Sequence, residues 1–121
     1  GVTVSPGISA VQVLAARHRI PLNRVGESVQ IITGREAEQV DPARVQNAVV
    51  MLDYNASFQR FLGQDMDIYW GGYLGADDEV LVAGPLDEVL DELLRVKASL
   101  REEKGWLMDT YLLRRRSPKS T

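Results

Sequence analysis

The chain has 121 residues, enough for one domain with one hydrophobic core. Its composition, 45% hydrophobic and 26% charged, is typical of a soluble globular protein. The formal net charge of −3 argues against a dedicated nucleic-acid-binding protein, which needs an excess of Lys and Arg. Because the chain has no cysteine, disulfide bonds and thiolate metal sites are excluded, and we expect a cytoplasmic protein. The apolar runs are only as long as strands, so we expect no membrane-spanning segment.

The first half of the chain alternates between predicted strands and helices. Residues 2–4 form a short predicted strand, and Ser9 is predicted to cap a helix that runs to about residue 18. That helix ends before Pro21, because the residue before a proline avoids the helical conformation. A second strand is expected over residues 27–33. The polar stretch 34–46 is expected to be a loop, in which Asp41-Pro42 can open a short helical turn.

The second half begins with the apolar run 48–52, which is typical of a strand covered on both faces. Asn55 or Ser57 is predicted to cap a helix that runs to residue 62. Strands are expected at 67–75, 79–83 and 106–114, and the first two should form an antiparallel hairpin. The longest helix is expected between Pro85 and Gly105. This order predicts an α/β fold with a mixed, mostly five-stranded sheet flanked by helices.

Few residues are candidates for acid–base or metal chemistry. His18 is the only histidine, and its helical spacing from Val11 and Leu14 favours a structural role. No Cys or His cluster indicates a zinc or iron site, so no metal is expected. The acidic turn 77–79 is expected to be a solvated hairpin tip. Asp109 lies in an alternating strand and should need a buried partner such as an arginine.

Three predicted strand ends carry residues suited to ligand binding. Asp53 follows the buried strand 48–52, Gly71-Gly72 interrupt the next strand, and the "SPGISA" stretch leads into a helix whose first amides are free. In open α/β sheets, ligands bind beyond the carboxyl ends of the strands. The residues alone therefore indicate the ligand-binding half of an α/β enzyme and name no substrate.

Several stretches match a known pattern. "VTVSPGISAVQVLAARHRIPLN" and "GESVQIITGR" contain a strand, a Pro-Gly-Ile-Ser turn, a helix, an Ile-Pro-Leu segment and a strand ending in Thr-Gly. "AVVMLD" and "EVLVAGPLDEV" follow at the expected places. With these motifs the chain resembles the C-terminal domain of tetrapyrrole (corrin/porphyrin) methylases over nearly its whole length. We therefore expect residues 1–116 to be that domain, and residues 117–121 to be a flexible tail.

Three other stretches narrow the resemblance to one branch of that family. "ARHRIPLNRVGE", "IYWGGYLG" and "GWLMDTYLLRRR" look most like the branch that methylates precorrin-5 at C1 and releases acetate, in the aerobic route to cobalamin. The resemblance implies a cytoplasmic homodimer that uses S-adenosyl-L-methionine, with S-adenosyl-L-homocysteine as the product. The alternatives are a family member acting on another precorrin, on ribosomal RNA or on diphthamide, or a non-enzymatic ligand-binding or dimerisation module.

The resemblance also implies cofactor-binding residues at each of the three strand ends. They are Ser9 and Ala10 after the Pro-Gly-Ile turn, Leu52 and Asp53 at the strand end whose backbone meets the adenine, and Gly72, Tyr73 and Leu74 in the segment that closes over the adenosine. No catalytic residue is implied. The family's glycine-rich loop and Gly-Gly-Asp-Pro segment belong to the N-terminal domain and are missing from this chain. We therefore expect the chain to supply half of a cofactor site and to be inactive alone.

Overall fold

One mixed five-stranded sheet organises the chain in the computed structural model, which describes residues 6–22 and 26–116, the backbone only for residues 6–9. The predicted strand at residues 2–4 and the predicted tail at 117–121 lie outside the described residues. The elements in chain order are α1 (Pro6–His18), β1 (Gln30–Thr33), α2 (Gly34–Ala37), the 3₁₀ helix η1 (Pro42–Arg44), β2 (Asn47–Met51), the 3₁₀ helix η2 (Ser57–Phe61), β3 (Met66–Gly72), β4 (Val80–Pro85), α3 (Leu86–Lys104) and β5 (Asp109–Arg115).

The strand order across the sheet is β1-β2-β5-β3-β4. β1 and β2 are parallel, whereas β5 runs antiparallel to both of its neighbours, β2 and β3. β3 and β4 form the expected antiparallel hairpin. The last strand is therefore inserted between strands that precede it in the chain, and it brings residues 109–115 next to residues 47–51.

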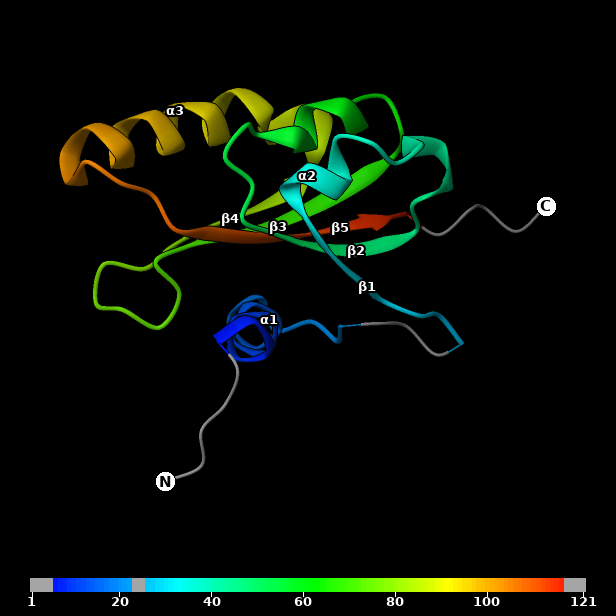
Figure 1. Ribbon diagram of the computed structural model, residues 1–121, viewed down its shortest axis with the longest axis horizontal. Coiled ribbons are helices and arrows are strands. Elements are labelled where there is room, and N and C mark those ends of the chain that lie inside the picture. Colours follow the sequence, from blue (N-terminus) through cyan, green and yellow to red (C-terminus); the bar gives the residue numbers. More distant parts are fainter. Residues whose placement is uncertain (1–5, 23–25, 117–121) are drawn as a thin grey trace.

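Helices cover both faces of the sheet, which confirms the predicted fold class (Figure 1). The larger core lies between the sheet and α3, and it also includes side chains from α2 and η2. On the opposite face, α1 packs Val11 and Leu14 against Val49 of β2 and Leu112 of β5. Side chains alternate between the two faces along each strand, so Val49 contacts α1 while its neighbour Val50 belongs to the larger core.

Local signals predicted several elements correctly. The longest helix follows Pro85 and ends at Gly105, whose φ of 78° is the left-handed conformation typical of a helix C-terminus. Asp41 caps η1 through a hydrogen bond from the Ala43 N–H to its carboxylate. No helix in the described part of the chain is long and apolar enough to cross a membrane.

Other predictions about the elements were wrong. α1 begins at Pro6, so Ser9 lies in its first turn and is not the cap; proline is well suited to the first helical position. The polar stretch after Thr33 contains α2, because Thr33 and Glu36 form a reciprocal capping box.

The helix expected before residue 62 is the 3₁₀ helix η2, and neither Asn55 nor Ser57 caps it. Its first residue, Ser57, instead donates its N–H to the carboxylate of Asp53 at 2.7 Å. The Asp53 carboxylate therefore satisfies a free N–H of the first turn, as a capping side chain would. The predicted strands also shift at their ends, since β1 begins only at Gln30 and β3 already ends at Gly72.

Candidate functional site

Four strand ends meet at one edge of the sheet. The register pairs Thr33 of β1 with Met51 of β2, Met51 with Thr110 of β5, and Gly72 of β3 with Asp109. The carboxyl ends of β1, β2 and β3 therefore lie beside the amino end of β5. Two pockets open at this edge.

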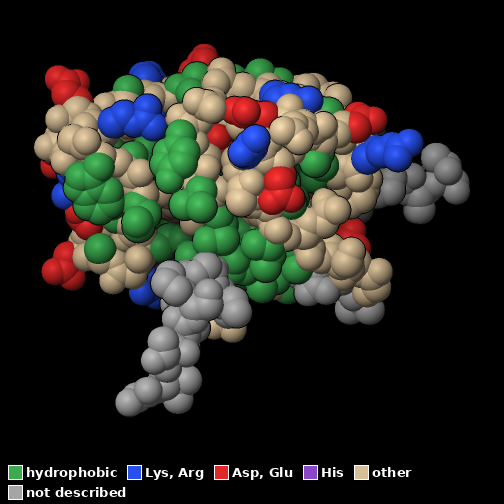
Figure 2. Space-filling view, viewed as in Figure 1, with side chains coloured by type: hydrophobic (Ala, Val, Ile, Leu, Met, Phe, Trp, Pro, Cys, Tyr) green, Lys and Arg blue, Asp and Glu red, His purple; other side chains and the backbone are tan. Residues whose placement is uncertain are grey.

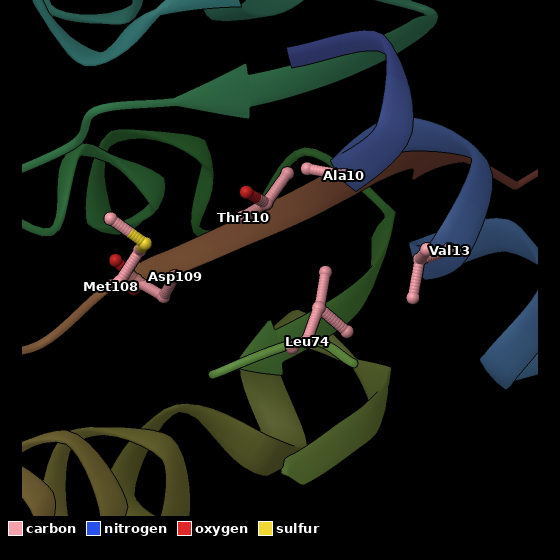
Figure 3. A pocket seen from close by; sticks show the side chains of 7 residues that line it. Ala10, Val13, Leu74, Met108, Asp109 and Thr110 are labelled. Atoms are coloured by element: carbon pink, nitrogen blue, oxygen red, sulfur yellow. The ribbon is translucent and has the colours of Figure 1, made fainter. Parts of the chain in front are cut away.

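The Leu74 pocket lies on the α1 side of the sheet (Figure 3). It has a volume of about 260 Å³ and is lined by Ala10, Val13, Gly71, Leu74, Met108, Asp109 and Thr110. Gly71 allows this close packing, because a Cβ at this position would lie 2.5 Å from Leu74 Cδ2 and would displace that side chain. The absence of a side chain lets Leu74 fold back over β3 and form one wall.

Thr110 supplies the polar group of the Leu74 pocket. Only 6% of this residue is exposed, and no hydrogen bond joins its hydroxyl to another residue in the described part of the chain. A hydroxyl in the wall of an open pocket keeps its hydrogen bonds to water and can exchange that water for a ligand. Thr110 is therefore well placed to form a hydrogen bond to a ligand in this otherwise apolar pocket.

The Leu52 pocket lies beyond the ends of β1 and β2. Its volume is about 540 Å³, and its lining residues are Thr33, Gly34, Arg35, Glu38, Leu52, Asp53, Tyr54 and Asn55. Leu52 has a φ of 56°, a left-handed conformation that is uncommon for residues other than glycine. The side chains of Leu52 and Tyr54 are 60% and 73% exposed.

Exposed hydrophobic side chains are frequent around these pockets. Besides Leu52 and Tyr54, Trp106 and Met108 near the start of β5 are more than half exposed. Figure 2 shows hydrophobic side chains gathered on the face of the molecule that is seen in Figure 1, between the α3 layer and the lower side of the molecule. Apolar side chains that gather on a surface mark sites where a ligand or another protein surface binds.

Asp53 turns its carboxylate away from the pocket and into the protein. The residue is 4% exposed, and its carboxylate accepts hydrogen bonds from the N–H of Asn55, the N–H and hydroxyl of Ser57, and the hydroxyl of Tyr111. Burial, and after it the negative charge of Asp53, raises the pKa of Tyr111, so the phenol stays protonated and donates.

Asp109 has two partners, a tryptophan and a lysine, and not an arginine. Its carboxylate accepts from Trp70 Nε1 at 2.7 Å and from Lys97 Nζ at 3.2 Å. The Lys97 ammonium also lies 5.1 Å from the centre of the Phe58 ring. Lysine is the partner because α3 runs over the face of the sheet towards which Asp109 points. The Asp109 carboxylate therefore forms a buried structural ion pair with Lys97.

The acidic turn after β3 is tied to both helical layers. Glu79 pairs with Arg17 of α1 at 3.0 Å, and Asp78 pairs with Lys104 of α3. Asp77 and Asp78 are exposed, as expected of a solvated tip, whereas Glu79 is partly buried against Arg17 of α1. Among the described residues no group of three or more His, Cys, Asp or Glu side chains could hold a metal ion.

His18 has the structural role that its helical spacing predicts. One ring nitrogen lies 3.0 Å from the Trp70 carbonyl, and the ring packs edge-on against Tyr69. Since a carbonyl oxygen can only accept, this nitrogen carries the proton. Partial burial lowers the pKa of His18, an effect that the Trp70 carbonyl and the charge of Glu79 only partly offset.

The structure divides the predicted site residues among different places. Ala10 and Leu74 line the Leu74 pocket, whereas Leu52 and Asp53 line the Leu52 pocket. Ser9 lies in α1, and its side chain is outside what the structure describes.

Gly72 and Tyr73 line neither pocket. A Cβ at Gly72 would lie 2.7 Å from Trp70 Cη2, on the opposite face of the sheet from the Leu74 pocket. Tyr73 is buried, and its hydroxyl donates to the Trp106 carbonyl at 2.5 Å. Both residues therefore support the turn that carries Leu74.

Sequence reasoning missed Gly71, Met108 and Thr110 as lining residues. Gly71 could have been found, because period-two alternation puts Gly71 and Gly72 on opposite faces of a strand. Thr110 and Met108 had no local signal. They belong to the site only because β5 pairs with β2 and β3, and a contact between distant segments is not visible in either segment alone.

Comparisons with known proteins agree with this fold. Residues 1–90 match the model of the Tetrapyrrole (Corrin/Porphyrin) Methylases. The chain is 48% identical over 112 residues to a Sinorhizobium protein named Precorrin-6A synthase [deacetylating], which covers 93% of this chain and 43% of that protein. The chain thus spans less than half the length of this curated relative.

Solved structures show the same arrangement. A Corynebacterium diphtheriae protein described as cobalamin synthesis related (CobF) superposes with a TM-score of 0.79 at 40% identity, over 87% of this chain and 44% of that protein. A Thermus thermophilus uroporphyrin-III C-methyltransferase, solved with S-adenosylhomocysteine, shares the fold at 15% identity and a TM-score of 0.52, over 85% of this chain and 48% of its own. With its five-stranded mixed sheet and its match over residues 1–90, this chain belongs to the tetrapyrrole (corrin/porphyrin) methylase family.

Proposed function

We propose that this chain is part of an S-adenosylmethionine-dependent methyltransferase that methylates precorrin-5 at C1 and releases acetate, forming precorrin-6A in cobalamin biosynthesis. The observation that carries the proposal is the 48% identity, over 93% of this chain, with a protein named Precorrin-6A synthase [deacetylating]. Identity at this level over almost the whole chain favours this reaction over that of a sibling methylase. The macrocyclic precorrin is then the substrate.

The two pockets offer what a nucleoside cofactor needs. The walls of the Leu74 pocket are mostly apolar, and the Thr110 hydroxyl in its wall has no hydrogen-bond partner among the described residues. Its glycine, Gly71, lets Leu74 lie close to β3 and form one wall. Pockets for small molecules combine apolar walls with a few polar groups in this way. Ala10, Leu74 and Thr110, with the backbone around Leu52, are the residues that we propose hold S-adenosylmethionine.

Little acid–base chemistry is needed from these residues for methyl transfer. When bound, S-adenosylmethionine supplies an electrophilic methyl group, and transfer depends on holding the acceptor carbon in line. The buried acids Asp53 and Asp109 are both occupied by internal partners. This chain contributes apolar walls that exclude water and the Thr110 hydroxyl, which orients the ligand.

The chain is proposed to supply only one wall of the complete site. The Leu74 pocket, at about 260 Å³, lies below the range of roughly 300–1,000 Å³ that is typical of ligand pockets. Together with the 43% coverage of the curated relative, this supports the interpretation that residues 1–116 are a C-terminal domain. An N-terminal domain would then supply the other wall. We also propose a homodimer that acts in the cytoplasm; the lack of cysteine is compatible with that compartment.

The test uses the full-length protein that contains this chain. Calorimetry should detect S-adenosylhomocysteine binding, and incubation with S-adenosylmethionine and precorrin-5 should release one acetate for each methyl group transferred. Binding without acetate release would replace the proposal with another methylase of the family. A protein that does not bind S-adenosylhomocysteine would instead be a non-enzymatic module of the same fold.

A further inference from the structure

The carboxylate of Asp53 has no capacity left for a ligand. An ionised carboxylate has about four acceptor positions on its two oxygens. Oδ1 accepts from Asn55 N at 3.1 Å and from Ser57 Oγ at 3.0 Å, and Oδ2 accepts from Ser57 N at 2.7 Å and from the hydroxyl of Tyr111. Asp53 lines the Leu52 pocket, but all four of these donors come from the protein.

Tyr111 connects this network to the centre of the sheet. It is fully buried in the middle of β5, 58 residues from Asp53 in the chain, and its ring packs edge-on against Phe58 at 5.3 Å. A phenol held by a central strand has little freedom to move. Its hydroxyl is therefore a fixed reference point for the carboxylate, and through it for the segment that follows β2.

Gly34 closes the other side of the network. A Cβ at this position would lie 2.5 Å from Asp53 Cα, so the backbone after β1 packs directly against the backbone after β2. The Ser57 hydroxyl also lies 3.3 Å from the Gly34 carbonyl. The segment 52–57 is thus held from β1, from β5 and from its own helical turn.

Leu52 adopts its unusual conformation directly beside this network. Its φ of 56° is one that a leucine avoids unless the surrounding structure imposes it. Met51 on one side is fixed in β2, and Asp53 on the other side is fixed by its four hydrogen bonds. As a result Leu52 and Tyr54 project into solvent at the pocket rim.

We propose that Asp53 is a positioning residue: anchored by Tyr111 and Ser57, it fixes the backbone of residues 52–54 at the pocket rim and does not itself contact the ligand. This inference rests on the proposed function, because it assigns a role in binding the methyl donor and its product. The inference gives Asp53 a different role from Leu52: the backbone around Leu52 contacts the ligand, and Asp53 holds that backbone in place.

The test is Tyr111→Phe in the full-length protein, which keeps the ring on Phe58 and removes only the hydroxyl. We expect the dissociation constant for S-adenosylhomocysteine, measured by calorimetry well below the unfolding temperature, to rise by up to about tenfold, because the rim backbone loses its anchor and must be ordered when the ligand binds. At saturating S-adenosylmethionine, kcat should stay near the wild-type value, since the reacting atoms are untouched.

The matched control is Tyr69→Phe. Tyr69 lies on the neighbouring strand β3, but its ring packs against His18 on the α1 face and has no contact with the Asp53 network. This variant should bind S-adenosylhomocysteine like the wild type. If Tyr111→Phe does not fold, Ser57→Ala removes another donor to Asp53 and should raise the same dissociation constant several-fold.

The outcomes separate this inference from the proposed function. If folded Tyr111→Phe, or Ser57→Ala in its place, binds S-adenosylhomocysteine as tightly as the wild type, the network is only structural and the positioning role is wrong, while the proposed function stands. If the wild-type protein does not bind S-adenosylhomocysteine, the proposed function fails and the inference fails with it.

Discussion

At the scale of single residues, Gly71 and Gly72 of β3 have different structural roles. Gly71 faces α1 and leaves the space that Leu74 fills, whereas Gly72 faces α3 and leaves the space that the Trp70 indole fills. Neither glycine has a positive φ, so close packing is what favours glycine at both positions. Only the first bears on the ligand pocket.

Substitutions at the two glycines should therefore separate binding from stability. We expect Gly72→Val to lower the free energy of unfolding by about 1–3 kcal/mol, as overpacking of a core does, because the new side chain displaces Trp70. Gly71→Ala should instead displace Leu74 and weaken S-adenosylhomocysteine binding. Urea unfolding and calorimetry on both variants check this, and the opposite ranking would show that Gly72 is the residue nearer the ligand.

Thr110 allows a second separation at this scale. Thr110→Val keeps the shape of the side chain and removes a hydroxyl that has no partner among the described residues. Stability should be unchanged or slightly higher, while S-adenosylhomocysteine binding should weaken by about 0.5–1.5 kcal/mol, the net value of a typical hydrogen bond. Calorimetry and thermal unfolding of the full-length variant measure the two effects. Unchanged affinity would remove Thr110 from the proposed site.

At the scale of elements, α1 is the helix that closes the Leu74 pocket, and His18 fastens its end to β3. The His18 ring reaches the Trp70 carbonyl and packs against Tyr69, while Arg17 pairs with Glu79 in the turn of the β3–β4 hairpin. The core under α1 is small compared with the core under α3. Conditions that disturb His18 should therefore act on α1 before they act on the rest of the fold.

Acid is such a condition. The pKa of His18 is lowered from its ordinary 6.5, so the unfolded chain binds a proton near pH 6.5 that the folded chain binds only at lower pH. Stability should consequently fall as pH drops through 6.5, and be fully present above it. Urea unfolding of this chain between pH 7.5 and 5.5 tests this, because His18 is its only histidine.

The matched variant for this experiment is His18→Gln, which keeps a donor for the Trp70 carbonyl but does not titrate. Its stability should change less between pH 7.5 and 5.5 than that of the parent chain. Equal slopes for the two proteins would mean that another group causes the pH dependence. Asp78, whose pKa is lowered by Lys104, loses its pairing only in more acidic solution and does not interfere in this range.

At the scale of the whole molecule, the sheet edge that carries the two pockets exposes several large hydrophobic side chains. Leu52, Tyr54, Trp106 and Met108 are all more than half exposed around pockets that are small or open. We predict that this 121-residue chain binds S-adenosylhomocysteine at least tenfold more weakly than the full-length protein and transfers no methyl group. Calorimetry on both proteins tests this, and equal affinity would contradict the proposal that the site needs a second wall.

The sequence by itself determined what depends on neighbours along the chain. Pro85 and Gly105 delimit α3, Asp41 caps η1, and the apolar run 48–52 marks β2, because caps and periodicity act over a few residues. The family resemblance also placed Ala10, Leu52, Asp53 and Leu74 at strand ends, where the structure has pocket-lining residues.

Only the tertiary structure decided how these ends combine. The insertion of β5 between β2 and β3 brings Thr110 and Met108 into the Leu74 pocket and Tyr111 to Asp53. Local preferences do not specify which strands pair, since pairing is set by the burial of whole faces across the sheet. For the same reason the sequence does not show that four donors from the protein occupy the carboxylate of Asp53.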